Sequence, residues 1–169
     1  MSNVKNFDHK KAIDKLKSLV HGISIHLFCS DPKTDEGFTS RPMSAIKVCD
    51  QGNMWFFSEK DSDKNKAIDN DENMQLFFSH PAKGSFLVVN GEEEIILDKS
   101  KIEEMWTSAA KIWFEEGKDD PNIAIIKVIP TTEYYWDTNG NRMINFIKMV
   151  ASVVTGTNLL NGEEGLITL

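Results

Sequence analysis

Two cations and two hydroxyls lie close together in the sequence, at positions that could bind a phosphate group. Arg41 opens an apolar segment in the stretch T-S-R-P-M-S-A-I, and Ser58 ends the apolar segment that follows it. Ser62 and Lys64 come immediately afterwards, at the start of a polar segment. A guanidinium can bind two phosphate oxygens at once, while hydroxyls, an ammonium group and the amides of a helix N-terminus can donate to the others. The set predicts a site for a phosphate monoester.

An antiparallel hairpin would bring these residues together. Residues 40–49 and 54–58 are strand-like, and the D-Q-G-N turn at 50–53 joins them. If the pairing continues in register, residues 41–44 lie within reach of residues 57–62.

An apolar and aromatic surface would run beside this site. Met43 and the W-F-F stretch that ends at Phe57 provide a surface suited to a flat ring. Each feature also has a structural interpretation, because Arg-Pro is common in turns, lysines near residue 64 can solvate a helix face, and W-F-F is ordinary barrel core. On composition alone the structural interpretation is favoured.

The rest of the pattern predicts strands joined by hairpins, with a few helices at the periphery. Three- and four-residue spacing of apolar residues indicates helices, and β-branched and aromatic runs between turn residues indicate strands. The expected elements are a helix over 7–20 ended by Gly22, strands over 23–29 and 73–79, a surface helix over 61–70, a hairpin over 85–97 with Asn-Gly at its tip, helices over 98–115 and 143–154, and a strand over 122–137 with a bulge or edge at Pro130. This pattern favours a mainly β fold, a small antiparallel barrel of six to seven strands, over a doubly wound sheet.

Size, charge and cysteine content limit the function classes. The chain has 169 residues, 40% hydrophobic and 27% charged, which suits one domain over 1–169 with its core at about 10–140 and a C-terminal helix and tail at 141–169. The net charge of -7 argues against binding of nucleic acid or anionic lipid. Cys29 and Cys49 lie in apolar runs with no metal-ligand spacing, so we expect reduced thiols and no metal site. A polar N-terminus and the lack of a membrane-spanning segment make the cytoplasm the expected location.

Several motifs in a fixed order resemble one family. S-R-P-M at 40–43, D-x-G-x-M-W-F-F-S at 50–58 and D-S-D-K at 61–64 are followed by W-F-E-E-G-K-D-D-P at 113–121 and Y-Y-W-D at 134–137. Together they resemble the flavin-binding split-barrel family of pyridoxamine 5'-phosphate oxidase-like proteins, and in particular its general stress protein branch. The resemblance covers roughly residues 10–140.

The resemblance implies a homodimer of split barrels with flavin mononucleotide (FMN) bound at the subunit interface. The residues that match the family's site each receive a role. Arg41 and Lys64 would bind the flavin phosphate, with Ser58 and Ser62 as hydroxyl donors; Met43, Ser44 and Phe57 would line the isoalloxazine ring; and Trp136, with Trp113 as a further candidate, would approach from the other subunit.

Three departures argue against pyridoxamine-phosphate oxidation itself. The lysine expected five residues after the strand-opening arginine is Ile46, and Lys47 is one residue late, which turns its side chain to the opposite face. Asp63 replaces an arginine before Lys64, and the final Arg-x-His motif is reduced to Arg142.

Two functions therefore stay open. The chain is either an FMN-dependent oxidoreductase or flavin carrier with an unknown small-molecule substrate, or a dimeric binding or stress-protection module without flavin. A haem-binding version is the weakest alternative, because none of the four histidines is marked as an axial ligand.

Overall fold

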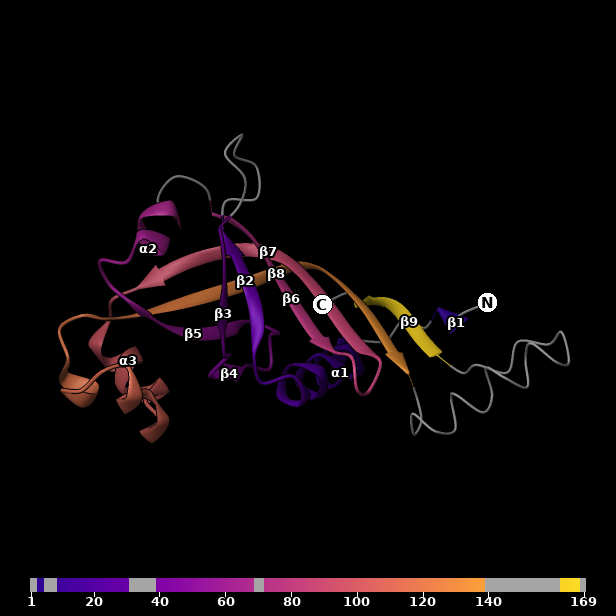
Figure 1. The fold of residues 1–169 in the computed structure, drawn as a ribbon, viewed down its shortest axis with the longest axis horizontal. Coiled ribbons are helices and arrows are strands. Elements are labelled where there is room, and N and C mark those ends of the chain that lie inside the picture. Colours follow the sequence, from indigo (N-terminus) through magenta and orange to yellow (C-terminus); the bar gives the residue numbers. More distant parts are fainter. Residues whose placement is uncertain (1–2, 5–8, 31–38, 69–71, 139–161, 168–169) are drawn as a thin grey trace, which may run out of the picture.

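The computed structural model describes residues 3–4, 9–30, 39–68, 72–138 and 162–167 (Figure 1). The elements in these ranges follow in chain order: β1 (Asn3–Val4), α1 (His9–Gly22), β2 (His26–Ser30), β3 (Thr39–Met43), β4 (Lys47–Val48), β5 (Met54–Glu59), α2 (Asp63–Ile68), β6 (Asn73–His80), β7 (Ser85–Ile96), α3 (Lys99–Met105), the short 3-10 helices η1 (Ser108–Ile112) and η2 (Gly117–Asp119), β8 (Ile123–Thr138) and β9 (Gly162–Ile167).

The strands form one curled sheet. Its main path runs β1-β9-β8-β7-β6-β2-β3, while β5 pairs with the first half of β8 and β4 pairs with β5. Among the described strands only the β1–β9 pair is parallel. In Figure 1 the long strands β7 and β8 cross the centre, α1 lies beneath the middle of the sheet and α3 lies at the lower left. The predicted mainly β, antiparallel split-barrel architecture with peripheral helices is confirmed.

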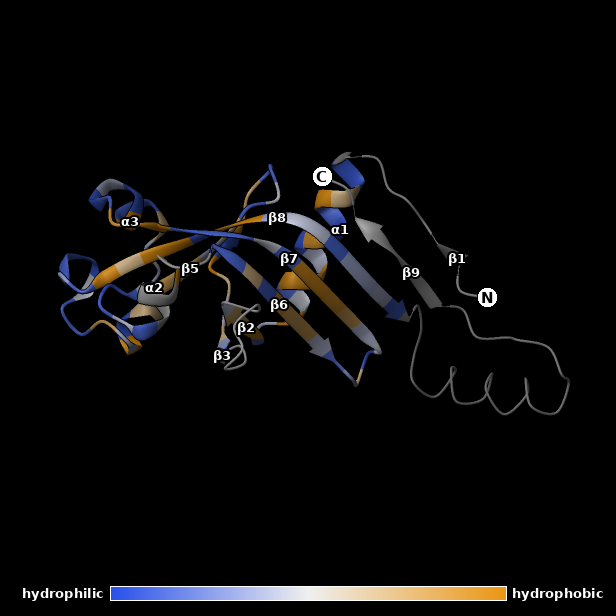
Figure 2. Ribbon diagram, turned by 90° about the horizontal axis from the view of Figure 1, so that it is seen from above, coloured by the Kyte–Doolittle hydropathy of each residue, from blue (hydrophilic) through white to orange (hydrophobic). Residues whose placement is uncertain are grey.

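The sheet has a buried inner face covered by α1. Alternate residues of the strands point inward, and α1 adds the apolar stripe that its sequence predicts. This inner core contains Ala12, Leu16, Leu19, Val20, Phe28, Phe56, Leu76, Phe78, Leu87, Val89 and Tyr135. Figure 2 shows that the first half of β8 is mostly hydrophobic, whereas the second half is paler to hydrophilic. The first half, which pairs with β5, is also the more deeply buried.

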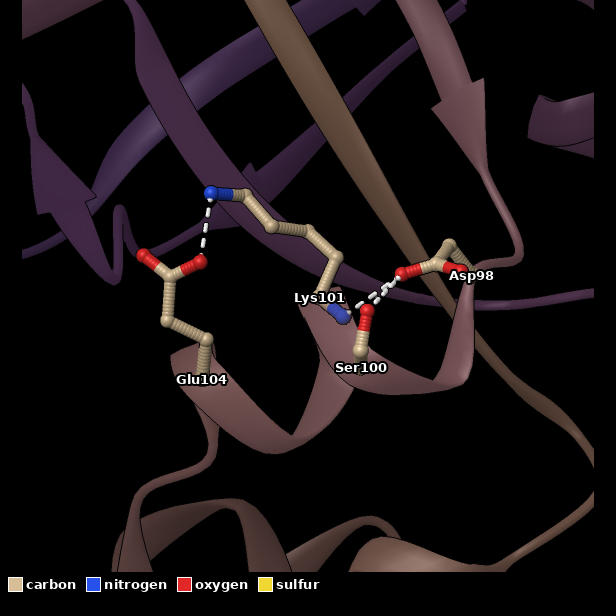
Figure 3. Close-up of polar contacts among 4 residues, drawn as sticks. All are labelled: Asp98, Ser100, Lys101 and Glu104. Atoms are coloured by element: carbon tan, nitrogen blue, oxygen red, sulfur yellow. Dashed lines mark hydrogen bonds and ion pairs between the residues drawn. The ribbon is translucent and has the colours of Figure 1, made fainter.

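A second core lies on the other face of β5 and β8. Trp55 and Ile125 pack there against Ile102 and Met105 of α3 and against Phe114. The start of α3 is fixed by Asp98, whose carboxylate accepts hydrogen bonds from the Lys101 backbone amide at 2.8 Å and from Ser100 (Figure 3). The Lys101 ammonium bonds Glu104 at 2.8 Å and lies 4.4 Å from the centre of the Trp55 ring. This capped helix therefore holds the outer face of β5 in place.

The hairpin expected over 85–97 is wrong. β7 runs without a turn through Asn90 and Gly91, and its register against β8 shifts there because Gly91 faces Pro130 while Asn90 faces Thr132. Gly91 has no positive φ, which an Asn-Gly hairpin turn requires. A Cβ atom on Gly91 would lie 2.6 Å from the Ile129 carbonyl oxygen, so the glycine serves close strand approach. The bulge predicted from Pro130 is confirmed.

Other boundaries differ less. The helix expected over 98–115 ends at Met105, because Trp106 is extended, and the chain continues in η1 and η2. β1 and β9 were not predicted from the sequence. The helix expected over 143–154 falls outside the described residues, and the single domain over 1–169 stays a prediction.

Candidate functional site

The candidate site lies where two edges of the sheet face each other without pairing. The strand predicted over 40–49 is two strands in the structure. β4 pairs with β5 as the predicted hairpin requires, but β3 pairs with β2, with Met43 opposite His26 and Arg41 opposite Phe28. Among the described strands β3 and β5 are not paired. The expected continuous hairpin is therefore wrong for the residues before Lys47, which pair with β2 instead of β5. A pocket lies between β3 and β5.

The pocket has a volume of about 270 Å³. It is bounded by the end of β3, the end of β5, the turn before α2 and the segment after η1. Its lining residues are Arg41, Pro42, Met43, Ser44, Phe57, Ser58, Glu59, Ser62, Trp113 and Phe114.

Most of the predicted site residues converge on this pocket. Those that line it are Arg41, Met43, Ser44, Phe57, Ser58, Ser62 and Trp113. Lys64 lies in the first turn of α2, two residues after Ser62, but its side chain is outside the described part of the structure. Arg41 is half-buried and lines the pocket.

Trp136 lies elsewhere in the same chain. Phe57 pairs with Ile125, whereas Trp136 pairs with Phe86 near the far end of β8. The stretch from Ile125 to Trp136 spans roughly 35 Å at ~3.3 Å per residue. Trp136 therefore does not line the pocket of its own chain, whereas Trp113 does.

One wall of the pocket is aromatic and fixed. The Phe57 ring makes edge-to-face contacts with Trp106 at 5.7 Å and Phe114 at 6.0 Å between centroids. Trp113 is 64% exposed at the rim. An exposed indole beside a packed aromatic wall can lie against a planar ligand without rearrangement of the core.

The connection from β5 to α2 is held by Asn65, which is only 3% exposed. The Ser58 hydroxyl donates to the Asn65 side-chain oxygen at 2.8 Å, and the Asn65 side-chain amide donates to the Lys60 carbonyl at 3.2 Å. The Asn65 backbone amide donates to the Ser62 hydroxyl oxygen at 3.3 Å. Sequence reasoning missed Asn65; the available signal was Ser62, because a serine directly before a helix typically accepts the backbone amide of the third helical residue. It also missed Glu59 and Phe114, which directly follow predicted residues.

A neutral histidine lies behind the pocket strands. His26, 3% exposed, stacks on Phe78 at 4.2 Å and meets the edge of Phe56 at 5.3 Å. Its ring nitrogens have no hydrogen-bond partner among the residues that the structure describes. Burial lowers the pKa of His26 to about 4, so the inner side of the pocket adds no positive charge at neutral pH.

The arrangement combines a half-buried arginine, hydroxyls and an aromatic wall. These groups suit a ligand with an anionic end and a flat ring. Within the described ranges no group of three His, Cys, Asp or Glu side chains could hold a metal ion. In the same part of the chain, no helix has both the length and the apolar character needed to cross a membrane.

The sequence matches the family model described as pyridoxamine 5'-phosphate oxidase like over residues 11–160. The chain belongs to this family. Two curated relatives are matched over only part of their lengths, since the chain spans 64% of one and 54% of the other. The second is General stress protein 26 of Bacillus subtilis, which is 28% identical over 76 residues, or 43% of this chain.

Solved structures share the fold of this pyridoxamine 5'-phosphate oxidase-like chain. A protein of Jannaschia sp. CCS1, provisionally named general stress protein 26, superposes with a TM-score of 0.74 at 19% identity and covers 96% of this chain and 100% of its own. The general stress FMN/FAD binding protein of Xanthomonas citri superposes with a TM-score of 0.64 at 23% identity, covering 77% of this chain and 90% of its own. At 19% and 23% identity, these similarities show a shared fold alone.

Proposed function

We propose that this chain binds FMN in the pocket between β3 and β5 and acts as a flavin-dependent oxidoreductase on a small molecule. The observation that carries the proposal is the convergence of Arg41 and Ser62 with the Phe57 wall in one pocket. Bound FMN would supply the hydride and electron chemistry. The protein then has to hold, orient and shield the flavin, and this role does not require an acid–base pair at the pocket.

Each lining group has a part in this binding. The Arg41 guanidinium, assisted by Lys64, binds the phosphate, and the Ser62 hydroxyl donates to it. Met43, Ser44 and Phe57 lie against the isoalloxazine ring, and Trp113 covers its exposed side. Ser58 is 4% exposed and its hydroxyl hydrogen is directed to Asn65, so Ser58 offers the ligand acceptor lone pairs.

We also propose a homodimer, supported by an apolar row on the outer face of the sheet. Leu27 pairs with Phe77, Phe77 with Val88, and Val88 with Tyr134, so these side chains cross four strands in register. Leu27 is 47% exposed and Tyr134 46%. A row of apolar side chains in a sheet face of this kind is typical of an interaction surface.

The next residue pair on this face of β7 and β8 includes Trp136, the residue that a partner subunit would supply. Phe86 pairs with Trp136 on the same outer face, and the two are 38% and 43% exposed. A second copy on this face would bury both rows. It would also allow Trp136 to approach the flavin of the partner, as the family resemblance implies.

A reducing, cytoplasmic location completes the proposal. Cys29 and Cys49 are both free thiols, and Cys29 is buried. Burial raises the pKa of the Cys29 thiol, which makes it a poor nucleophile at neutral pH.

The flavin site is tested by removing its cations. FMN binding should be lost in the double variant Arg41→Ala/Lys64→Ala, because the phosphate would lose both charges that balance it. Lys83→Ala is the matched control, since it removes an exposed cation from the β6–β7 turn. Flavin absorbance that stays with the double variant after gel filtration, at the level of the control, would contradict the site assignment.

A second candidate function is a dimeric binding or stress-protection module without flavin. It is favoured by the acids around the phosphate end, where Glu59 lines the pocket and Asp61 and Asp63 are exposed beside it. Like charges weaken phosphate binding. A stable, colourless dimer whose melting temperature does not change with added FMN would support this function over the first.

A further inference from the structure

A second cavity, of about 480 Å³, lies between α1 and the segment that contains β4, and we call it the α1 cavity. Its lining residues are Lys17, Val20, His21, Ser24, Ser44, Ala45, Ile46, Lys47 and Val48. The volume is within the roughly 300–1,000 Å³ of pockets that hold small molecules. Ser44 also lines the pocket between β3 and β5. The two cavities therefore meet at a residue that the proposed function places against the isoalloxazine ring.

The titratable lining of the α1 cavity is basic. It consists of Lys17, His21 and Lys47, and among the described residues no Asp or Glu lines the cavity. Lys47 lies opposite Trp55, and its charge also acts on Glu104 of α3, so it is shared with the other face of the sheet. Lys17 and His21 are the two basic residues that α1 supplies to the cavity. Such a lining favours an anionic ligand.

Several polar groups of the α1 cavity are available to a ligand. The side chains of His21, Ser24 and Ser44 make no hydrogen bond to protein groups within the described ranges, and an imidazole and two hydroxyls can each donate to a carboxylate. The Lys17 ammonium donates to the exposed Asp50 carboxylate at 2.5 Å. An ammonium group has three hydrogens, and an exposed ion pair contributes little. Lys17 can therefore bind a second carboxylate.

The remaining lining of the α1 cavity is apolar and packed. Val20 is 7% exposed and belongs to the inner core, and Ala45 and Val48 pack against that core. Ile46 packs against the second core. These side chains offer a fixed surface to the apolar body of a ligand, next to the basic groups that would hold its charged end.

Another cavity that adjoins the pocket between β3 and β5 has the opposite charge. It has a volume of about 330 Å³ and shares Trp113 with that pocket, and its acidic lining residues are Glu59, Asp61 and Asp120. These carboxylates would repel an anion. Of the two cavities that adjoin the proposed flavin site in this way, the α1 cavity is the one that suits an acid.

We propose that the α1 cavity binds the substrate of the protein, and that this substrate is a small organic acid. Its carboxylate is bound by Lys17 and His21, its apolar body lies on Val20 and Val48, and Ser44 marks the side on which it meets the isoalloxazine ring. This inference rests on the proposed FMN site and adds the substrate class.

The test uses benzoate as the probe and benzamide, its uncharged analogue, as the control ligand. In calorimetric titrations the wild type should bind benzoate at millimolar or lower concentration, and benzamide roughly tenfold more weakly, because the amide lacks the charge. In FMN-loaded protein benzoate should also shift the visible flavin absorption bands, because a ligand beside the ring changes its surroundings.

Two variants of one ion pair should have opposite effects on benzoate binding. Lys17→Gln removes a cation from the cavity and should weaken binding by roughly tenfold, the effect of losing one hydrogen bond between charged groups. Asp50→Asn breaks the same ion pair but leaves Lys17 charged, and should strengthen binding by up to about fivefold. Lys10→Gln, at an exposed position of α1 outside the cavity, is the matched control and should bind like the wild type. Circular dichroism checks that each variant is folded.

The outcomes separate this inference from the proposed function. If Lys17→Gln and Asp50→Asn change benzoate binding in the same direction, the ion pair acts only on the structure and the carboxylate site is wrong. A wild type that holds FMN would also overturn the inference, with the flavin site intact, if it binds no benzoate, binds benzamide equally well, or binds benzoate without a change in the flavin bands. A wild type that holds no FMN refutes the proposed function, and the substrate role falls with it.

Discussion

Glu133 should make the protein less stable as the pH rises, which is opposite to the usual effect of an acidic residue in an ion pair. It lies on β8 opposite Val89, 1% exposed, and its Oε1 atom has no hydrogen-bond partner within the described residues. Burial raises the pKa of Glu133 from 4.5 to about 7. Below pH 4.5 the carboxyl is neutral in both the folded and the unfolded chain, so it causes no penalty there.

Between these two values the unfolded chain loses the proton before the folded chain does. The free energy of unfolding therefore falls by about 1.4 kcal/mol per pH unit over this window and then becomes constant, a total of about 3 kcal/mol. Glu133→Gln keeps the shape of the side chain and cannot ionise. The variant should match the wild type near pH 4 and exceed it by up to about 3 kcal/mol above pH 7.

The measurement is urea unfolding at a series of pH values, followed by tryptophan fluorescence. Glu115→Gln is the matched control, because it makes the same substitution at an exposed position. The result is the difference in the free energy of unfolding between Glu133→Gln and the wild type at each pH. This difference cancels the contribution of other groups that titrate in the same range. A difference that stays constant from pH 4 to about 8 would refute the assignment of Glu133 as a buried, unionised acid.

Two further predictions concern the sheet. Gly91→Ala should lower the free energy of unfolding by about 1–3 kcal/mol, because the new Cβ atom would press on the Ile129 carbonyl oxygen. Gly22→Ala is the control, because a Cβ atom there has open space, and equal urea midpoints for the two variants would contradict the close approach at Gly91. Tyr134→Lys adds a charge to the apolar row and should convert the proposed dimer to monomers, as measured by light scattering. Ile112→Lys, at an exposed apolar position outside this row, should leave the measured mass unchanged. A dimeric Tyr134→Lys variant would mean that another face forms the interface.

The sequence predicts most of the strands correctly because their patterns are local. Period-two and period-3.6 apolar spacing identified β5, β6 and α1 to within a few residues. Asn90–Gly91 was misinterpreted for a physical reason: the same dipeptide suits a tight turn and a bulge, and the choice depends on the strand that packs beside it. That neighbour, around Pro130, is about forty residues away in sequence.

The candidate site was predicted from residue types and a family resemblance, but the reasoning about its geometry was partly wrong. A continuous hairpin was expected to bring Arg41 to Ser58, whereas the two lie on separate sheet edges because β3 pairs with β2. The role of Asn65 was not predicted, since hydrogen-bond direction depends on the fold of the turn and not on residue type alone. β9 pairs with β8 from far along the chain, and its short sequence has no strong strand pattern.

The central claim is that the pocket between β3 and β5 holds FMN. The most direct measurement is the visible absorption spectrum of the purified protein, before and after incubation with FMN and removal of the excess by gel filtration. We predict that the oxidised-flavin bands elute with the protein at about one flavin per chain. Protein that elutes folded and colourless after incubation would contradict the claim and favour a flavin-free binding module.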